Sequence, residues 1–199
     1  MDEADFVIEW DGADDRLVAI EPTPDEVARH APELAVAYNH PANAALMGHT
    51  DVISEEEIVE HYADMAEDGA HQFLLFRDGV FVGDGDLRGL RDGSAEFAFM
   101  VGAPSAQGRG LGTRFALMIH ALGFRHLGLE RIYASVVPEN VASRRVFEKL
   151  GYLPDDSEAA RAYADEPGDV TLVIDRATFE DRHAPALAQL RITRHDRRT

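Results

Sequence analysis

The sequence predicts a single α/β domain in which helices cover a mixed β-sheet. The chain has 199 residues, 45% of them hydrophobic and 28% charged, which suits one compact domain with its own core. A strand-rich middle lies between helical segments, and residues 95–150 follow the order strand, helix, strand, helix. No repeat or interdomain linker interrupts the chain. We therefore expect one domain over residues 1–183 and a loosely ordered tail over residues 184–199.

The first hundred residues predict two helices and four strands. Thr23 followed by Pro24 marks one helix start. Ser54 with a glutamate three positions on marks a second helix, which continues to Gly69. Aspartate–glycine pairs at residues 78–79 and 92–93 indicate turns between strands. The strands are expected at residues 17–20, 72–76, 80–83 and 95–101.

The second half predicts helices packed on the sheet. Residues 111–126 carry apolar side chains at helical spacing, and Gly128 supplies a stop just beyond them. A β-branched run at residues 132–137 predicts a strand, and residues 142–150 predict a helix that ends at Gly151. A last strand is expected at residues 170–174. The arginine-rich residues 191–199 predict a solvated tail.

Charge is uneven along the chain. The formal net charge is -18, which disfavours attraction to nucleic acid or to an anionic membrane. Residues 1–100 contain 24 acids and 5 bases, whereas residues 101–150 contain 3 acids and 7 bases. A positive segment within an acidic protein is typical of a site for an anionic ligand, although chance fluctuation is the alternative.

Other features of the composition exclude several kinds of site. The chain has no cysteine, so it has no disulfide framework and no thiolate chemistry. The nine histidines show no metal-ligand spacing, so we expect no metal. The N-terminus is acidic and no apolar stretch is long enough to span a membrane, so we expect a cytoplasmic protein. The single lysine beside 18 arginines fits adaptation to high salt, and a GC-rich genome is the alternative.

A glycine-rich turn between a strand and a helix is the candidate anion site. Three glycines in five positions let the backbone approach a ligand closely, and the first amides of the helix have no partner within it. These amides also lie at the positive end of the helix dipole, so a pyrophosphate would fit there. No lysine follows the glycines, which excludes the Walker pattern. The residues are Gln107, Gly108, Arg109, Gly110, Leu111, Gly112 and Thr113.

Two motifs together resemble the GNAT superfamily of acyl-CoA-dependent N-acetyltransferases. The first is the turn itself, in which Gln107, Gly110 and Gly112 match the family's hallmark. The second is an asparagine with a small residue three positions later and a helix that closes on glycine and an aromatic residue. Asn140, Ser143, Gly151 and Tyr152 supply it. The serine and the Glu-Lys-Leu-Gly-Tyr ending look most like the Rim-type branch, which acetylates ribosomal-protein N-termini.

The resemblance implies a mixed, splayed sheet that holds acetyl-CoA between its two central strands. Backbone groups of Met100, Val101 and Gly102 would bind the pantetheine arm, and residues 107–113 would hold the pyrophosphate. Asn140 would contact the cofactor arm, and its alternative role is to cap the following helix.

The resemblance also implies direct attack of a neutral amine on the thioester in a ternary complex. Glu96, inside an apolar strand, would be the general base, and a buried salt bridge to an arginine is the alternative. The backbone N–H of Met100 would stabilise the oxyanion. Many relatives have a tyrosine as the general acid where this chain has Phe147, which cannot donate a proton. Ser143 is the position used instead by the Rim-type branch, and a small residue packed on the cofactor is its alternative role.

The acceptor is expected to be a primary amine on a small molecule or at a protein N-terminus. Such a cation would be attracted by the acidic first half of the chain. Asp84, Asp86 and the helix start at residues 55–57 could line its pocket, and solvated surface is the alternative for each of them. A non-catalytic acyl-CoA-binding or sensing domain is the competing function, and a homodimer is possible.

Overall fold

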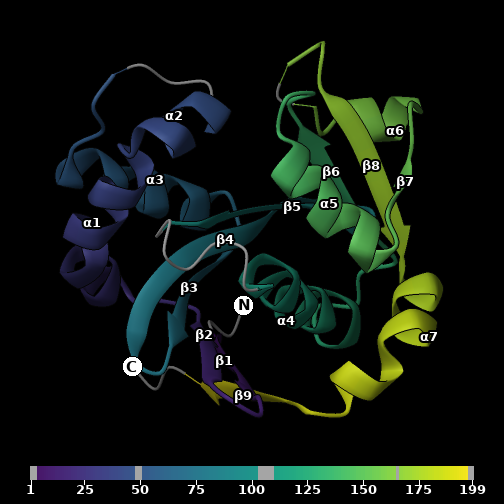
Figure 1. Cartoon of the computed structure of the whole chain (residues 1–199), viewed down its shortest axis with the longest axis horizontal. Coiled ribbons are helices and arrows are strands. Elements are labelled where there is room, and N and C mark those ends of the chain that lie inside the picture. The colour runs from purple at the N-terminus through teal and green to yellow at the C-terminus, as the bar shows by residue number, and fades with distance from the viewer. Residues whose placement is uncertain (1–3, 48–50, 103–109, 165, 197–199) are drawn as a thin grey trace.

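The chain forms one mixed β-sheet with helices on both faces, as the sequence predicts (Figure 1). The computed structural model describes residues 4–47, 51–102, 110–164 and 166–196. Within these residues the strand order is β7-β8-β6-β5-β4-β3-β2-β1-β9. The strands are β1 (Ala4–Asp11), β2 (Arg16–Ile20), β3 (His71–Arg77), β4 (Val80–Arg91), β5 (Ser94–Val101), β6 (Arg131–Val136), β7 (Leu153–Pro154), β8 (Val170–Asp175) and β9 (Leu190–Asp196). The helices are α1 (Pro24–Tyr38), α2 (Pro41–Met47), α3 (Glu55–Glu67), α4 (Leu111–Arg125), α5 (Val141–Leu150), α6 (Glu158–Arg161) and α7 (Arg176–Leu187).

The sheet opens between β5 and β6. These two strands run parallel and pair over only three positions, from Ser94 opposite Arg131 to Glu96 opposite Tyr133. Beyond Glu96, β5 continues beside β4 and β6 continues beside β8, and the two halves of the sheet diverge (Figure 1). The splayed sheet implied by the family resemblance is therefore confirmed.

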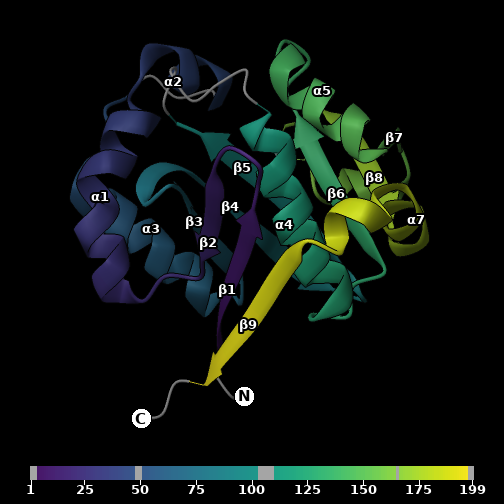
Figure 2. The ribbon, with the colours of Figure 1, turned by 60° about the horizontal axis from the view of Figure 1, so that its bottom comes forward.

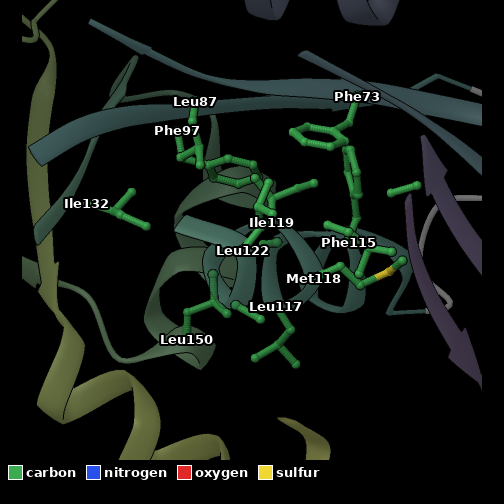
Figure 3. Close-up of a cluster of buried hydrophobic side chains, with 14 of the residues drawn as sticks. Phe73, Leu87, Phe97, Phe115, Leu117, Met118, Ile119, Leu122, Ile132 and Leu150 are labelled. Carbon is green, nitrogen blue, oxygen red and sulfur yellow. The ribbon is translucent and has the colours of Figure 1, made fainter. Parts of the chain in front are cut away.

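Alternate residues of the strands pack on helices of opposite faces. Phe73, Leu87 and Phe97 face α4, which buries eleven of its fifteen residues (Figure 3). Leu74, next to Phe73, points the other way and packs with residues of α1 and α3, including Tyr62. The middle strands are thus covered on both faces, and α4 is the helix that lies under the opening.

The helix starts follow the predicted chemistry. Thr23 and Ser54 each form a full capping box with the glutamate three positions later, Glu26 and Glu57. The helix that follows the glycine-rich turn begins differently, because its N-cap Gly110 is left-handed and gives no side-chain cap. The first turn of α4 therefore keeps its backbone donors for another partner.

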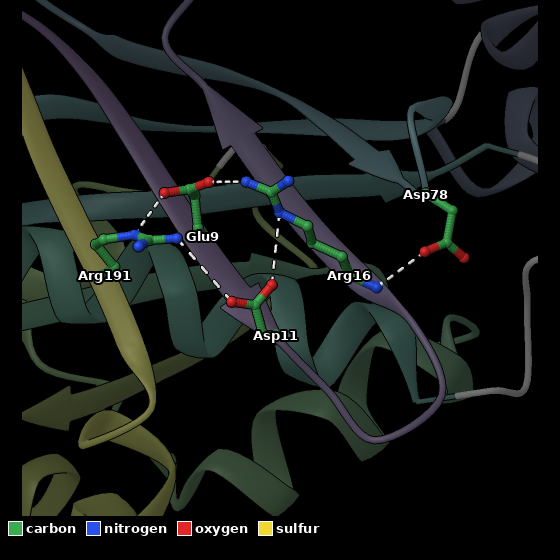
Figure 4. A network of polar contacts seen from close by, with 5 residues as sticks. All are labelled: Glu9, Asp11, Arg16, Asp78 and Arg191. Atoms are coloured by element: carbon green, nitrogen blue, oxygen red, sulfur yellow. Dashed lines mark hydrogen bonds and ion pairs between the residues drawn. The ribbon is translucent and has the colours of Figure 1, made fainter.

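The tail that the sequence predicts to be loosely ordered from residue 184 is instead ordered to residue 196. Helix α7 ends at Leu187, and β9 follows and pairs with β1 along seven positions (Figure 2). Arg191 Nε lies 2.6 Å from Glu9 Oε2, and Arg16 also contacts Glu9 (Figure 4). Arg191, one of the arginines that suggest a solvated tail, therefore forms ion pairs on the outer face of a strand.

A histidine without charge lies in the core beneath the sheet. His120 is fully buried, its Nδ1 donates to the Ala116 carbonyl at 2.7 Å, and Tyr152 Oη donates to its Nε2 at 2.6 Å. Burial among aromatic rings lowers the pKa of His120 to about 3. The folded protein therefore holds this imidazole neutral throughout the physiological range.

We expect His120 to make the fold sensitive to acid. Its folded pKa lies below the unfolded value of 6.5, so its contribution is complete above pH 6.5 and is lost as the pH falls toward 3. The double variant His120→Leu/Tyr152→Phe removes the titration and leaves no orphaned hydroxyl. Between about pH 7 and pH 4.5 the wild type should lose unfolding free energy, and the variant should lose about 2 to 3 kcal/mol less of it. Denaturant titration at each pH measures both losses. If the unfolding free energies of the wild type and the variant changed equally with pH, His120 would not be a buried neutral group.

Candidate active site

Two connected cavities occupy the opening between β5 and β6. The first, of about 370 Å³, is here called the α4 cleft and lies between the end of β5, the start of α4, helix α5 and helix α2. The second, of about 500 Å³, is called the β4 cavity and extends over β4 toward α1 and α3. The lining residues common to both are Leu46, Met47, Phe99, Met100, Asn140 and Ser143. Ligands in the two cavities would therefore meet at Met100 and Asn140.

The described part of the turn that the sequence predicts to bind an anion, residues 110–113, lines the α4 cleft. Gly110 adopts a φ of 75°, a left-handed conformation that favours glycine. The first amide to bond within the helix is that of Arg114, to the Gly110 carbonyl at 3.1 Å, so the preceding amides point out of the helix. At Gly112 a Cβ would stand 3.0 Å from the Phe99 ring, which is tighter than ordinary contact. Gly110 is thus favoured by its backbone conformation, and Gly112 by the narrow space beside Phe99.

Helix α5 adds positive charge to this cleft. Arg145 and Lys149, one turn apart, both line it, and its described lining includes no carboxylate. The individual residues were not predicted from the sequence, although the positive charge of residues 101–150 was the signal that could have identified them. Backbone donors and two cations together favour a ligand with several negative charges.

The structure brings most of the predicted cofactor residues together. Gly110, Leu111, Gly112, Thr113, Met100, Val101 and Asn140 all line the α4 cleft. Gln107, Gly108 and Arg109 lie outside the described residues. Gly102 is not among the lining residues, because its N–H donates to the Val82 carbonyl at 2.9 Å and its own carbonyl accepts from Asn43 Nδ2 at 3.3 Å. Asn43, a buried residue of α2, thereby fixes that helix to the end of β5.

Asn140 caps helix α5. Its Oδ1 accepts from the Ser143 amide at 3.0 Å, which is the capping role stated as the alternative for this residue. The capped helix start holds both residues at the junction of the two cavities. A direct contact of either side chain with a ligand stays a prediction.

The ladder between β4 and β5 orients the Met100 amide. Met100 lies opposite Asp84, and the Gly102 N–H donates to β4. Amides two residues apart on a strand point the same way, so the Met100 N–H faces β4, and those of Phe99 and Val101 face the opening. Met100 could hold an oxyanion only if its amide turned away from the ladder, so that role stays a prediction.

Glu96 is buried and ion-paired. It is 5% exposed, and its Oε2 accepts from Arg88 Nε at 3.0 Å. Glu96 and Arg88 lie opposite each other on adjacent strands, so their side chains share a face. This is the salt bridge stated as the alternative to a base role. Arg88 lines the β4 cavity, whereas Glu96 is not among its lining residues.

Asp84 is the carboxylate that the structure places in the wall of the β4 cavity. It is 4% exposed, so solvated surface is wrong for this residue. Its Oδ2 accepts from Tyr38 Oη at 2.7 Å and from Tyr62 Oη at 2.8 Å. Burial raises the pKa of Asp84 to about 6, against the opposing effect of the two hydroxyl donors. Neither tyrosine is predicted from the sequence to be a site residue.

The β4 cavity is acidic as a whole. Its described lining includes four carboxylates and one guanidinium, which are Asp84, Asp86, Glu166, Asp169 and Arg88. His61 also contributes to the wall. The helix start at residues 55–57 is exposed and does not line this cavity, so solvated surface describes it correctly. The two cavities therefore carry opposite charge on either side of Met100.

Phe147 belongs to the aromatic core between the cavities. It is 3% exposed, and its ring centroid lies 5.9 Å from that of Phe99 and 4.9 Å from that of Tyr152. It has no proton to donate, so any general acid must come from elsewhere. Ser143, one of the residues lining both cavities, is the predicted candidate.

Over the ranges that the structure describes, no cluster of histidine and acidic side chains could hold a metal ion. No helix in those ranges is long and apolar enough to cross a membrane.

Several solved structures share this fold. RimJ of Mycobacterium smegmatis, in complex with CoA-disulfide, aligns with a TM-score of 0.72 and 19% identity over 93% of this chain and 95% of its own. Aminoglycoside acetyltransferase AAC(6')-Ib in complex with coenzyme A aligns with a TM-score of 0.69 and 18% identity over 83% and 98%. Spermidine N-acetyltransferase from Vibrio cholerae, with CoA and spermine, aligns with a TM-score of 0.66 and 17% identity over 82% and 97%.

The family model described as "Acetyltransferase (GNAT) domain" matches residues 9–153, which is most of the chain. This match includes the glycine-rich turn, the open strands and the capped helix from which the resemblance was drawn. The chain belongs to the GNAT acetyltransferase domain family.

Proposed function

We propose that the protein is an acetyl-CoA-dependent N-acetyltransferase that transfers an acetyl group to a primary amine by direct attack in a ternary complex. The observation that carries this proposal is the pair of connected cavities, one cationic at a helix N-terminus and one acidic. Their charges complement a polyanionic acyl donor and a cationic acceptor. A shared wall at Met100, Asn140 and Ser143 would let the two substrates meet.

The donor would be held in the α4 cleft. The amides of residues 111–113 would bind the pyrophosphate, and Arg145 and Lys149 would neutralise further phosphate charge. The open edge of β5 would bind the pantetheine arm as an added strand binds a sheet edge. When bound, acetyl-CoA supplies a thioester carbonyl with a thiolate leaving group. The structures of relatives with CoA support this placement.

The acceptor would enter the β4 cavity as an ammonium ion. The four carboxylates outweigh the single guanidinium and therefore favour a cation in this cavity. One similar structure binds spermine, which is a polyamine. A protein N-terminus, as the Rim-type resemblance implies, presents the same charge. The amine panel described below tests which compound is acetylated.

The reaction needs three tasks from this chain. A base removes a proton from the amine nitrogen, which then forms the N–C bond as the C–S bond breaks and the thiolate leaves. Glu96 is the base predicted from the sequence. It would have to accept the proton while its Oε2 is hydrogen-bonded to the guanidinium of Arg88. A backbone amide of β5 would hold the oxyanion, and Ser143 would protonate the thiolate.

Removing one cation from the α4 cleft should weaken donor binding. Arg145→Gln is expected to raise the dissociation constant of CoA about tenfold, because a charge-assisted hydrogen bond to phosphate is lost. It should also flatten the dependence of binding on salt, measured by calorimetry at several salt concentrations. Arg161→Gln, at an exposed site outside both cavities, is the matched control and should bind CoA like the wild type. Equal CoA affinities of the two variants would contradict the placement of the donor in the α4 cleft.

Thiol release in the presence of amines tests the activity itself. Wild-type protein with acetyl-CoA should release CoA when supplied with spermine, kanamycin or a peptide that begins with alanine, and mass spectrometry should find the acetylated amine. Glu96→Gln should lower kcat by about 100-fold with CoA affinity intact if Glu96 is the base. Tight CoA binding with no acetylated product from any amine would favour the sensing domain instead.

A further inference from the structure

The two carboxylate oxygens of Asp84 differ in their hydrogen bonds. Tyr38 from α1 and Tyr62 from α3 both donate to Oδ2. Oδ1 is buried and has no hydrogen-bond partner among the described residues. A buried acceptor without a partner costs free energy, so its retention in the wall of a cavity points to a ligand that donates to it.

The location of Asp84 suits the acceptor side of the reaction. It lies opposite Met100 in the ladder, and Met100 lines both cavities. Residues opposite each other on antiparallel strands project to the same face, so Asp84, Met100 and Glu96 all face α1 and α3. Of the two carboxylates, Asp84 lines the cavity, whereas Glu96 is paired with Arg88.

We propose that Asp84 binds the ammonium group of the acceptor through Oδ1 and is the group that takes its proton. The proton passes from the substrate R–NH3+ to the carboxylate, which leaves R–NH2 and a neutral Asp84 carboxyl group. The lone pair so freed on nitrogen then attacks the thioester carbonyl, so that the N–C bond forms and the C–S bond breaks. The second proton of the nitrogen passes to the departing thiolate, which leaves as the CoA thiol, and Asp84 returns its proton to solvent. This inference rests on the proposed function and replaces the base within it.

The two tyrosines act as positioning residues. Tyr62 is buried and Tyr38 is partly buried, and both phenols donate to the same oxygen, which fixes the rotation of the carboxyl group and leaves Oδ1 for the substrate. Their hydrogen bonds also lower the pKa of Asp84, so that burial raises it only to about 6. A carboxylate that titrates near 6 is ionised at neutral pH and is a stronger base than an exposed aspartate.

Other charged groups face this site, and the test has to distinguish their effects on the pH profile from that of Asp84. They come from β4, β5, α3 and the segment before β8. They are Asp86, Arg88, Glu96, His61, Glu166 and Asp169. The variants below test whether the pH limb belongs to Asp84 or to one of these neighbours.

The experiment measures kcat/KM against pH for the wild type, Asp84→Asn, Tyr62→Phe and Glu96→Gln, with acetyl-CoA and the amine from the panel that reacts fastest. The wild type should gain activity as the pH rises through about 6 and then hold a plateau up to the pKa of the amine. Asp84→Asn should lower kcat/KM at pH 7 by about 100-fold and replace the plateau with a steady rise toward the pKa of the amine. Tyr62→Phe should move the limb upward by about one pH unit, because the carboxylate loses one donor. Glu96→Gln, whatever its effect on the rate, should leave the limb in place, because the titrating carboxylate is Asp84; a limb lost in Glu96→Gln and kept in Asp84→Asn would overturn the role of Asp84.

Asp64→Asn is the matched control, since it removes the same charge from an exposed position on α3, two residues from Tyr62. It should leave the profile unchanged. CoA affinity of every variant, measured by calorimetry, reports whether the fold and the α4 cleft are intact. Asp84→Asn activity within about threefold of the wild type, or a limb that Tyr62→Phe does not move, would overturn the role of Asp84. The proposed function fails separately, if the wild type neither binds CoA nor acetylates any amine of the panel.

Discussion

The early separation of β5 and β6 is the constraint on which the rest of the structure depends. Two parallel strands normally satisfy each other's backbone along their full length, but these pair over three positions and then diverge. Beyond Glu96 one edge of β5 faces a cavity instead of a strand. A sheet edge inside a protein needs hydrogen-bond partners, and an extended ligand with amide groups can supply them. The splay thus opens a cavity in the middle of the sheet, where we propose that acetyl-CoA binds.

The helices around the opening give its two sides opposite electrostatic character. On one side, α4 directs its unpaired first amides into the cleft while its remaining length is anchored in the core, and α5 adds two cations. On the other side, α1 and α3 each place a tyrosine on Asp84, so that a carboxylate stays buried next to the junction. Packing of helices on the sheet therefore sets the charge of each cavity, and the proposed chemistry follows from their contact at Met100.

The sequence predicts the fold class, the positive cleft and the family, because glycine positions and helix caps are local signals. It does not predict β1 or β9, although both alternate apolar and polar residues: Phe6 and Ile8 are buried and Ile192 is partly buried in the core, whereas Arg191 pairs with Glu9. The arginines of β9 outweigh that alternation when the segment is read alone. Its strand character depends on pairing with β1, 180 residues earlier. Asp84 shows the same limit, since its burial comes from tyrosines on two distant helices and not from its neighbours Gly83 and Gly85.

The most direct test of this account is a crystal structure with a bisubstrate analogue in which CoA is joined through its sulfur to an acetyl-linked spermine. The account predicts that the pyrophosphate lies within hydrogen-bond distance of the amides of residues 111–113. It also predicts that the pantetheine passes between β5 and β6 and that the amine nitrogen lies within hydrogen-bond distance of Asp84 Oδ1. An analogue bound elsewhere, or with its amine beside Glu96 while Asp84 keeps no ligand contact, would contradict it.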